Sequence, residues 1–499
     1  MSAFTVARAR RYALPVAFVA GLATAYAVSR SEPHLAASSA ARLNPTVAPA
    51  TTSYGDAVDR AAPAVVRVSV DRPADSSTMG FPDDSFLQRF FGPDWGQQGQ
   101  GRSPQVRRQQ APIERGVGSG VIMTADGTIL TNNHVVEGAQ RVSVTLTDGR
   151  EFPAKVVGTD PGTDLAVVHI DAKGLPTLQV ADSDRVRVGD VVLAVGNPLD
   201  MGQTVTMGII SAKGRVTDNG DNSIYENFLQ TDAPINRGNS GGALVTTTGE
   251  LVGINSQIVS PSGGSIGIGF AIPSNMAENV MSQLVATGHV RRGMLGVSAQ
   301  GLTSDMAKSL GLSSVHGAIV AEVTPDSPAA KAGVRQGDVI LKVNGEAIDD
   351  SNNLRNRISA MAPGSHVDLA IQRDGRSETL AVTLSETSPA TTSATPTSSS
   401  RPKSTEQALG MSLQALTPDL VRELRVPAGT TGLAVTNVDP SGAAARALIQ
   451  SGDVIRSVDG RAVSSTSEFR DAMTRGTGRP ALVLVQRQNQ TSYVALPRG

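Results

Sequence analysis

A duplicated module near the C-terminal end divides this chain into domains. Gly317–Gly345 and Gly432–Gly460 share an apolar strand, a turn with proline, a short Ala-rich helix, the run Gly-Asp-Val-Ile, and a strand that ends in Asn-Gly or Asp-Gly. Two copies at such a long spacing do not make a solenoid, so the repeat predicts two tandem domains, over 293–386 and 407–499. The Ser/Thr/Pro-rich stretch 387–406 between them is predicted as a linker.

The repeat also explains two aspartates that could be mistaken for acid catalysts. Asp338 and Asp453 occupy the same place in the Gly-Asp-Val-Ile run of each copy, so we predict a structural role for both. The copies differ where Gly333, a candidate helix C-cap, is replaced by Leu448.

Three residues upstream of the repeat lie in segments that suggest nucleophilic catalysis. Ser240 lies in Gly-Asn-Ser-Gly-Gly, His134 in Thr-Asn-Asn-His-Val-Val and Asp164 in Thr-Asp-Leu-Ala-Val. A serine hydroxyl needs a base to take its proton, and that base needs an acidic partner to orient it. Each segment alone has an ordinary explanation, as a glycine turn, a core histidine or a turn aspartate. Together, in the order His…Asp…Ser, they predict a serine-protease triad.

The glycines beside Ser240 suit a second part of that chemistry. The tetrahedral intermediate of acyl transfer carries an oxyanion, which backbone N–H groups stabilise. A flexible residue at Gly238 lets the chain turn so that neighbouring N–H groups converge. We therefore predict an oxyanion hole at Gly238, Asn239 and Ser240, with Asn239 shaping the turn.

Composition excludes several other functions. There is no cysteine, which rules out thiol catalysis and disulfides, and no His-Glu-x-x-His segment, so we expect no metal and no other cofactor. The formal net charge of −1 gives no overall field to attract nucleic acid, and none is expected as a partner. An esterase elbow also fits Gly-x-Ser-x-Gly, but its partner residues follow the serine, whereas here they precede it.

The N-terminus predicts export. Arg8, Arg10 and Arg11 precede the apolar stretch Ala13–Val28, with small-x-small cleavage candidates near its end. We expect a signal peptide or signal anchor over 1–28 and an Ala/Ser/Thr/Pro-rich tether over 29–52. The expected location is the periplasm, with membrane attachment only if the signal is not cleaved.

Aromatic residues concentrate in one insertion, 71–112. Aromatic residues make up only 3% of the chain, yet Phe81, Phe86, Phe90, Phe91 and Trp95 lie close together there. An exposed aromatic cluster suggests an interaction surface, and the alternative is that it packs onto its own domain.

Outside the insertion, the pattern between residues 53 and 288 is mainly β. Val65–Val70 alternates, and hairpins are predicted over Gly120–Val136 and Val142–Val157, each around an Asp-Gly turn. Further strands are expected, and many short strands with glycine turns favour a barrel or sandwich. A helix is predicted from Ser274, as N-cap, to about Ala286. The other expected strands are Val191–Val195, Thr204–Ile210 and Ala243–Ile254.

At the three catalytic segments, and at Gln230–Arg237 and Gly267–Pro273, the chain resembles the HtrA family, the Do-type or DegP/DegQ-like envelope serine endoproteases. The resemblance implies a chymotrypsin-like double β-barrel over 53–288. It also implies cleavage after small aliphatic residues, with a pocket at Ile235, Ile266, Ile268 and Phe270. The absence of cysteine favours a DegQ-like or MucD-like branch.

The same resemblance implies regulation. Arg215 matches the family's sensor arginine, in a loop near the catalytic serine that responds to bound peptide. A homo-oligomer built from trimers is expected on the same basis.

The duplicated domains resemble PDZ domains, which add a peptide to a sheet edge and hold its C-terminal carboxylate in a glycine-containing loop. The resemblance implies hydrophobic C-terminal peptides as ligands. The candidate loops are Met294, Leu295, Gly296 and Val297 in the first copy, and Leu409, Gly410 and Met411 in the second. The second domain could serve assembly instead.

Taken together, these features predict an ATP-independent serine endopeptidase for misfolded or unfolded envelope proteins, peptide-activated and with chaperone activity. A chaperone or scaffold that mainly holds its clients is the alternative, since one family includes both roles. A protease that has lost its activity is a third alternative, but all three catalytic positions are filled.

Overall fold

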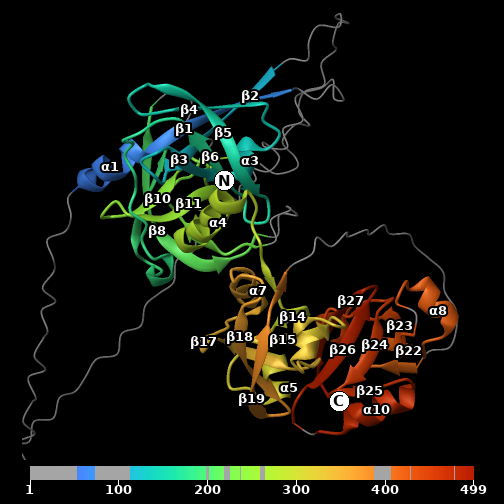
Figure 1. The fold of residues 1–499 in the computed structure, drawn as a ribbon. Coiled ribbons are helices and arrows are strands. Elements are labelled where there is room, and N and C mark those ends of the chain that lie inside the picture. Colours follow the sequence, from blue (N-terminus) through green and yellow to red (C-terminus); the bar gives the residue numbers. More distant parts are fainter. Residues whose placement is uncertain are drawn as a thin grey trace, which may run out of the picture. The chain divides into compact units, whose positions relative to one another are not determined.

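The structure is a computed structural model that describes residues 53–73, 113–197, 202–217, 225–236, 238–258, 264–386, 406–427, 429–476 and 478–498 (Figure 1). The predicted leader, the tether and nearly all of the aromatic insertion and the linker lie outside these residues. Within the described residues, no helix combines the length and the apolar character needed to cross a membrane.

Two closed β-barrels form the first part of the chain, drawn in blue to green in Figure 1. In the first barrel the strands follow the order β1-β2-β3-β6-β5-β4. They are preceded by α1 (Gly55–Ala61) and the 3-10 turn η1 (Ala62–Ala64). The strands are β1 (Val65–Pro73), β2 (Ile113–Ile122), β3 (Thr128–Asn132), β4 (Arg141–Thr145), β5 (Glu151–Asp160) and β6 (Leu165–Ile170).

The second barrel closes in the order β10-β11-β12-β9-β8-β7. The 3-10 turn η2 (Ser183–Arg185) precedes it. Its strands are β7 (Val191–Gly196), β8 (Thr204–Arg215), β9 (Phe228–Thr231), β10 (Ala243–Thr246), β11 (Leu251–Ile258) and β12 (Gly269–Pro273). Two barrels of six strands each confirm the predicted chymotrypsin-like class of the protease domain.

Local sequence explains most of these strands. The predicted Asp-Gly hairpins are confirmed, because β2 pairs with β3 and β4 pairs with β5 in antiparallel register. Buried valines alternate along β1 and fill the barrel interior. One expectation is wrong: the predicted strand to Val136 ends at Asn132, and the one-turn helix α3 (Asn133–Val136) follows.

Helix α4 (Ser274–Thr287) is the last element of the protease domain. It buries Ala277, Val280 and Leu284 at helical spacing and ends at Gly288, which has a left-handed φ of 77°. The predicted N-cap was wrong by one residue. Pro273 is the N-cap, while Ser274 begins the helix and its hydroxyl donates to the carbonyl of Ala181 at 2.6 Å. The tertiary contact therefore takes the hydroxyl that a cap would use.

The first duplicated domain is a sheet in the order β14-β15-β16-β18-β19, with β17 paired to β16 and a separate β13-β20 pair. Its strands are β13 (Gly293–Met294), β14 (Val297–Gly301), β15 (Ala318–Val323), β16 (Val339–Val343), β17 (Glu346–Ala347), β18 (His366–Arg373), β19 (Arg376–Thr383) and β20 (Ser385–Glu386). Its helices are α5 (Ser304–Leu310), α6 (Pro328–Lys331) and α7 (Ser351–Ser359).

The second copy repeats this plan in the order β21-β22-β23-β24-β26-β27, with β25 paired to β24. Its strands are β21 (Glu406–Ala408), β22 (Met411–Ala415), β23 (Leu433–Val438), β24 (Val454–Val458), β25 (Arg461–Ala462), β26 (Ala481–Arg487) and β27 (Gln490–Leu496). Its helices are α8 (Pro418–Glu423), α9 (Ala443–Arg446) and α10 (Thr466–Thr474).

The two repeated aspartates have the predicted structural role. Asp338 accepts from the Arg373 guanidinium at 2.7 Å and Asp453 from that of Arg487 at 2.6 Å, and each carboxylate also binds a backbone N–H of its own turn. Leu448 adopts φ 62°, close to the 81° of Gly333, so the second copy keeps the turn despite the bulkier residue.

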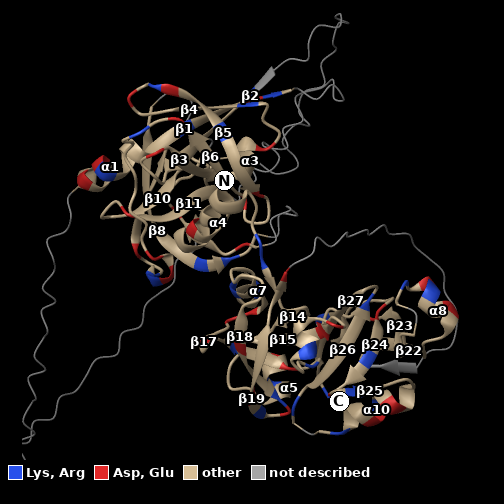
Figure 2. Cartoon of the chain, viewed as in Figure 1, with Lys and Arg blue, Asp and Glu red and all other residues tan. Residues whose placement is uncertain are grey.

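Charged residues of both signs are interspersed over the described elements, as Figure 2 shows. This mixed distribution agrees with the formal net charge of −1.

Candidate active site

Strand pairing brings the predicted base and acid together. Asn132, the last residue of β3, is paired with Leu165, the first residue of β6. His134 follows β3 and Asp164 precedes β6, so both lie at the same end of this strand pair. Both are buried, with exposed fractions of 6% and 9%.

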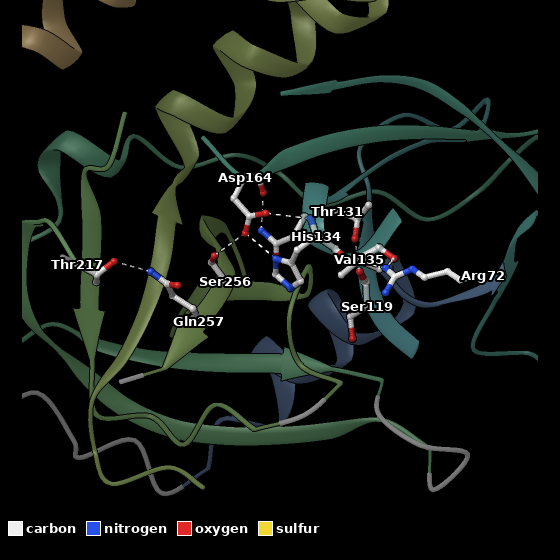
Figure 3. Close-up of polar contacts among 10 residues, drawn as sticks. Arg72, Ser119, Thr131, His134, Val135, Asp164, Thr217, Ser256 and Gln257 are labelled. Atoms are coloured by element: carbon white, nitrogen blue, oxygen red, sulfur yellow. Dashed lines mark hydrogen bonds and ion pairs between the residues drawn. The ribbon is translucent and has the colours of Figure 1, made fainter. Parts of the chain in front are cut away.

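The His134–Asp164 contact has the geometry of a catalytic pair. The imidazole Nδ1 lies 2.7 Å from Oδ2 of Asp164, and the backbone N–H of His134 donates to Oδ1 at 3.0 Å (Figure 3). An acceptor at Nδ1 favours the tautomer that carries its proton there, which leaves Nε2 able to accept a proton from a nucleophile.

Asp164 itself is held by the backbone and by a second hydroxyl. It has a positive φ of 57°, which aspartate tolerates better than most side chains. Its carbonyl accepts from Asn133 N and from Asn132 Nδ2, and Oδ2 also accepts from the Ser256 hydroxyl at 3.0 Å. Several bonds therefore fix both the position and the orientation of the carboxylate.

The turn Gly238–Gly242, called the serine turn below because it carries Ser240, joins the second barrel to the first. The Ser240 carbonyl accepts from Ser119 N of β2 at 2.8 Å, and Gly241 N donates to the Asn255 carbonyl of β11 at 2.8 Å. A side chain at Gly241 would place its Cβ 2.1 Å from the Ser119 carbonyl oxygen, at a φ of 81°. Glycine is therefore required at this position to let the turn reach the first barrel.

Ser119 is the central residue of that junction. Its hydroxyl donates to the Gly238 carbonyl at 2.5 Å and accepts from Asn197 N at 2.8 Å. Its carbonyl accepts from the Thr131 hydroxyl at 2.7 Å, three residues before His134. The same residue thus connects the serine turn with the strand that leads to the base.

The backbone N–H groups of the serine turn are the donors predicted for the oxyanion hole. The Asn239 N–H donates to the Asn236 carbonyl at 3.0 Å, which occupies that donor. Among the described residues, no carbonyl accepts from the N–H groups of Gly238 and Ser240. These two groups are the available donors for an oxyanion.

Ser240, the predicted nucleophile, is buried, with an exposed fraction of 1%, and within the described part of the chain its Oγ has no hydrogen-bond partner. A buried hydroxyl without a partner is costly, so its retention points to a catalytic role. A hydrogen bond to the base often forms only when substrate is bound.

The predicted pocket residues do not share one environment. Ile235 is buried in the core cluster of the second barrel, whereas Phe270 is buried in the larger cluster that includes the first barrel and α4. A Cβ at Gly269 would lie 3.0 Å from Ile235 Cδ1. Ile268 is partly buried against the core, and Ile266 is 53% exposed. All four remain predictions as specificity residues.

Comparisons with known proteins agree with this geometry. The trypsin-like peptidase domain family matches residues 118–254, and the PDZ domain family matches residues 293–384 and 407–497. The solved "HtrA-type protease AlgW with tripeptide" is 43% identical, with a TM-score of 0.53, over 68% of this chain and 98% of that chain.

Curated relatives extend the match to the full length. A "probable periplasmic serine endoprotease DegP-like" of Brucella suis is 39% identical over 524 residues, 100% of this chain and 99% of that protein. The "periplasmic pH-dependent serine endoprotease DegQ" of Escherichia coli is 40% identical over 89% of this chain and 91% of its own length. This chain belongs to the HtrA family of serine endoproteases. The names of these HtrA relatives also support the predicted periplasmic location.

As an HtrA serine endopeptidase, the chain contains two supporting residues that the sequence patterns did not identify. Ser119 and Ser256 are ordinary serines in strands, and only their positions opposite the serine turn and Asp164 reveal their roles. A sequence signal was present in Asn255-Ser256, two polar residues inside a strand that is buried throughout.

The HtrA sensor candidate lies at the end of β8. Arg215 Nε donates to Gln230 Oε1 of β9 at 3.1 Å, and most of the loop that follows lies outside the described residues. Thr217, at the start of this loop, contacts β11, the strand that also carries Ser256. Gln257 Nε2 of β11 donates to the Thr217 hydroxyl at 2.8 Å (Figure 3).

The two PDZ loops of this HtrA chain differ in backbone conformation. In both copies the loop leucine carbonyl accepts from an N–H of the short helix that follows β15 or β23, Ala329 or Ala444. In the second copy Leu409 and Gly410 have φ of 56° and 78° and form the turn of a hairpin between β21 and β22. In the loop of the first copy, Met294–Val297, only Gly296 has a positive φ.

Proposed function

We propose that this HtrA protein degrades unfolded or misfolded periplasmic proteins without ATP, and that peptides bound to its PDZ domains activate it. The observation that carries the proposal is the pairing of buried His134 with Asp164 at 2.7 Å in a chain that also has two PDZ domains. A protease with two peptide-binding modules can bind hydrophobic C-terminal residues that become accessible when a protein unfolds.

The reaction assigns each residue a role. His134 Nε2 takes the Ser240 proton as Oγ attacks the scissile carbonyl, and Asp164 stabilises the imidazolium that forms. The N–H groups of Gly238 and Ser240 stabilise the oxyanion, and a lost donor of this kind typically costs about 10²–10³ in rate. The imidazolium then protonates the leaving amine, and water hydrolyses the acyl-enzyme.

Substrate selection would come from the apolar residues Ile235, Ile266, Ile268 and Phe270. No acidic residue lies among them, so the proposed preference is for small aliphatic side chains before the cleaved bond. Such a pocket discriminates modestly between sizes, by roughly ten- to two-hundredfold per methylene.

Peptide binding is proposed for the first PDZ domain. Among the described strands, β14 is paired only with β15 and has one unpaired edge, and residues 294–297 lead into that strand. A peptide can add to this edge while loop N–H groups bind its carboxylate. In the second domain β22 already pairs with β21, so the role of residues 409–411 as a carboxylate loop stays a prediction.

Regulation and assembly complete the proposal. Arg215 would relay peptide binding toward the serine turn, since its strand partner β9 also pairs with β12 and the loop flank contacts Gln257. A trimer-based homo-oligomer and an additional chaperone activity are proposed on the family resemblance.

The deciding experiment compares the mature chain with its Ser240→Ala variant on unfolded casein and on a tightly folded protein. Each is measured with and without a hydrophobic C-terminal peptide. The proposal expects cleavage of casein only, by the unmodified protein only, and faster with peptide. If neither protein cleaves casein but both suppress its aggregation, the chaperone or scaffold alternative holds. Cleavage by Ser240→Ala would identify a different nucleophile.

A further inference from the structure

Helix α3 carries the general base, but it is a single turn. Four residues are too few for a helix to be stable by itself, and the last carbonyls of any helix lack partners within it. Two of its carbonyls bind the chain that follows: Asn133 O accepts from Glu137 N at 2.8 Å, and Val136 O accepts from Ala139 N at 3.1 Å.

The other two carbonyls of α3, those of His134 and Val135, both accept from one side chain of strand β1. Arg72 Nη2 donates to the His134 carbonyl at 2.8 Å and to the Val135 carbonyl at 2.9 Å. Figure 3 shows the guanidinium extending to this helix on the far side of His134 from Asp164. A cation at the C-terminal end of a helix is also favourable for the helix dipole.

Arg72 can restrict the position of α3 because its own strand is fixed in the barrel. It lies in β1, which pairs with β2 on one side and with β4 on the other. The guanidinium lies next to Gly116 of β2, since a Cβ at that glycine would be in ordinary contact with the guanidinium carbon, at 3.9 Å. The guanidinium is partly buried, so its hydrogen bonds are less exposed to competing water.

We propose that Arg72 is a positioning residue for His134 in peptide-bond hydrolysis. Asp164 fixes the imidazole through the ring, while Arg72 fixes the backbone from which the ring extends. The two contacts together determine where Nε2 points. Arg72 touches neither substrate nor the reacting atoms, and it acts only through the base.

The test uses the full mature protein with three substitutions. Arg72→Met keeps an unbranched apolar stem but removes the guanidinium and both hydrogen bonds, and Arg72→Lys restores a cation and a donor. Arg67→Met is the matched control, because Arg67 lies on the same strand but donates to the Thr145 hydroxyl at 3.2 Å. The kcat and KM for a peptide substrate and the unfolding midpoint are measured for each.

A small displacement of a catalytic group can cost up to about 10²-fold in rate. We expect kcat of Arg72→Met to fall about tenfold or more with KM nearly unchanged. Arg72→Lys should recover part of the loss, and Arg67→Met should behave as the unmodified protein. An unchanged kcat in Arg72→Met would overturn the proposal.

A second measurement separates positioning from a general structural role. The same Arg72→Met change is made in a His134→Ala background, where the residual turnover is measured with excess enzyme. A residue that acts only through His134 should cause no further loss there. An equal loss in both backgrounds, or a fall in unfolding midpoint that Arg67→Met shares, would show that Arg72 supports the barrel rather than the base.

Discussion

At the scale of single residues, the proposed catalytic pair of His134 and Asp164 combines charge with an unusual backbone conformation. Asp164 accepts two bonds from His134 and one from Ser256, and it does so at a φ of 57°. Aspartate and asparagine tolerate this conformation better than most other residues because their short polar side chains can bond locally. Position 164 therefore needs a carboxylate to contact His134 and, separately, a residue that tolerates a positive φ.

Two substitutions of Asp164 separate those demands. Asp164→Asn keeps the shape and the tolerated φ but favours the wrong imidazole tautomer, so kcat should fall by about 10⁴ with little change in stability. Asp164→Ala should lose as much activity and, in addition, lower the unfolding midpoint, because alanine is strained at this φ. Enzyme assays and thermal unfolding of the two variants test the distinction. Equal midpoints would contradict it.

The Ser256 hydroxyl donates to the same carboxylate oxygen, Asp164 Oδ2, that the His134 ring contacts. Ser256→Ala removes the hydroxyl that donates to Asp164 Oδ2 at 3.0 Å, so kcat should fall about tenfold, as expected for one lost charge-assisted bond of ~1.5 kcal/mol, while KM changes little. Ser282→Ala is the control, because that hydroxyl is exposed on α4 and donates to Asn279. If both variants have the same kcat, Ser256 does not support catalysis.

At the scale of elements, helix ends and tight turns need specific side chains. Helix α10 of the second PDZ domain begins with a capping box, in which Ser465 Oγ accepts from Glu468 N and Glu468 Oε2 accepts from Ser465 N, both at 3.2 Å. Ser464 N also donates to the same carboxylate at 2.7 Å. These bonds lower the pKa of Glu468 below its usual value of 4.5, the backbone bond from Ser464 most of all.

The lowered pKa predicts how this helix responds to acid. A carboxyl whose folded pKa lies below its unfolded value adds stability above the unfolded pKa, and this stability is lost as pH falls through the folded pKa. At pH 7, Glu468→Gln should therefore lower the midpoint of the thermal transition in which the second PDZ domain unfolds. The difference in midpoint from the unmodified protein should shrink as pH falls below 4.5. Calorimetry at several pH values measures it.

The partner residue of the box provides the control. Ser465→Ala removes the cap without removing a titrating group, and it should cost ~1 kcal/mol. Its effect should persist in acid. A Glu468→Gln difference that stayed constant with pH would show that the carboxylate charge does not matter here.

At the scale of the whole molecule, the question is how peptide binding reaches the protease. Two residues at the start of the candidate sensor loop contact other strands of the second barrel: Arg215 bonds Gln230 of β9, and Thr217 accepts from Gln257, next to Ser256. The hydrogen bonds from Gln257 to Thr217 and from Ser256 to Asp164 thus lie on consecutive residues of β11. This arrangement makes the loop a candidate relay.

Arg215→Ala tests that relay. Basal cleavage should change little, whereas the acceleration by a hydrophobic C-terminal peptide should fall toward none, with peptide affinity retained. Lys213→Ala is the matched control on the same strand, since Lys213 Nζ donates to the carbonyls of Asp184 and Val186 instead. Peptide titrations of activity, with binding followed in parallel, give the answer. Full activation of Arg215→Ala would rule out the relay.

Local patterns were enough to predict much of this protein. The Asp-Gly turns predicted the hairpins, the alternation in Val65–Val70 predicted β1, and the repeat predicted two similar domains. The errors came where a distant contact decided the outcome. Ser274 bonds the Ala181 carbonyl instead of capping its helix, and α3 replaces the end of a predicted strand.

The sequence by itself determined the reaction, because nucleophile, base and acid each need a particular side chain in a particular local context. It also determined the barrel strands and the duplicated modules, whose signals are periodic and local. Only the tertiary structure decided that Ser119, Ser256 and Arg72 support the site, since a hydroxyl or guanidinium becomes important through what lies across from it. Long-range hydrogen bonds leave no local pattern, so strand pairing between distant segments had to be known before they could be recognised.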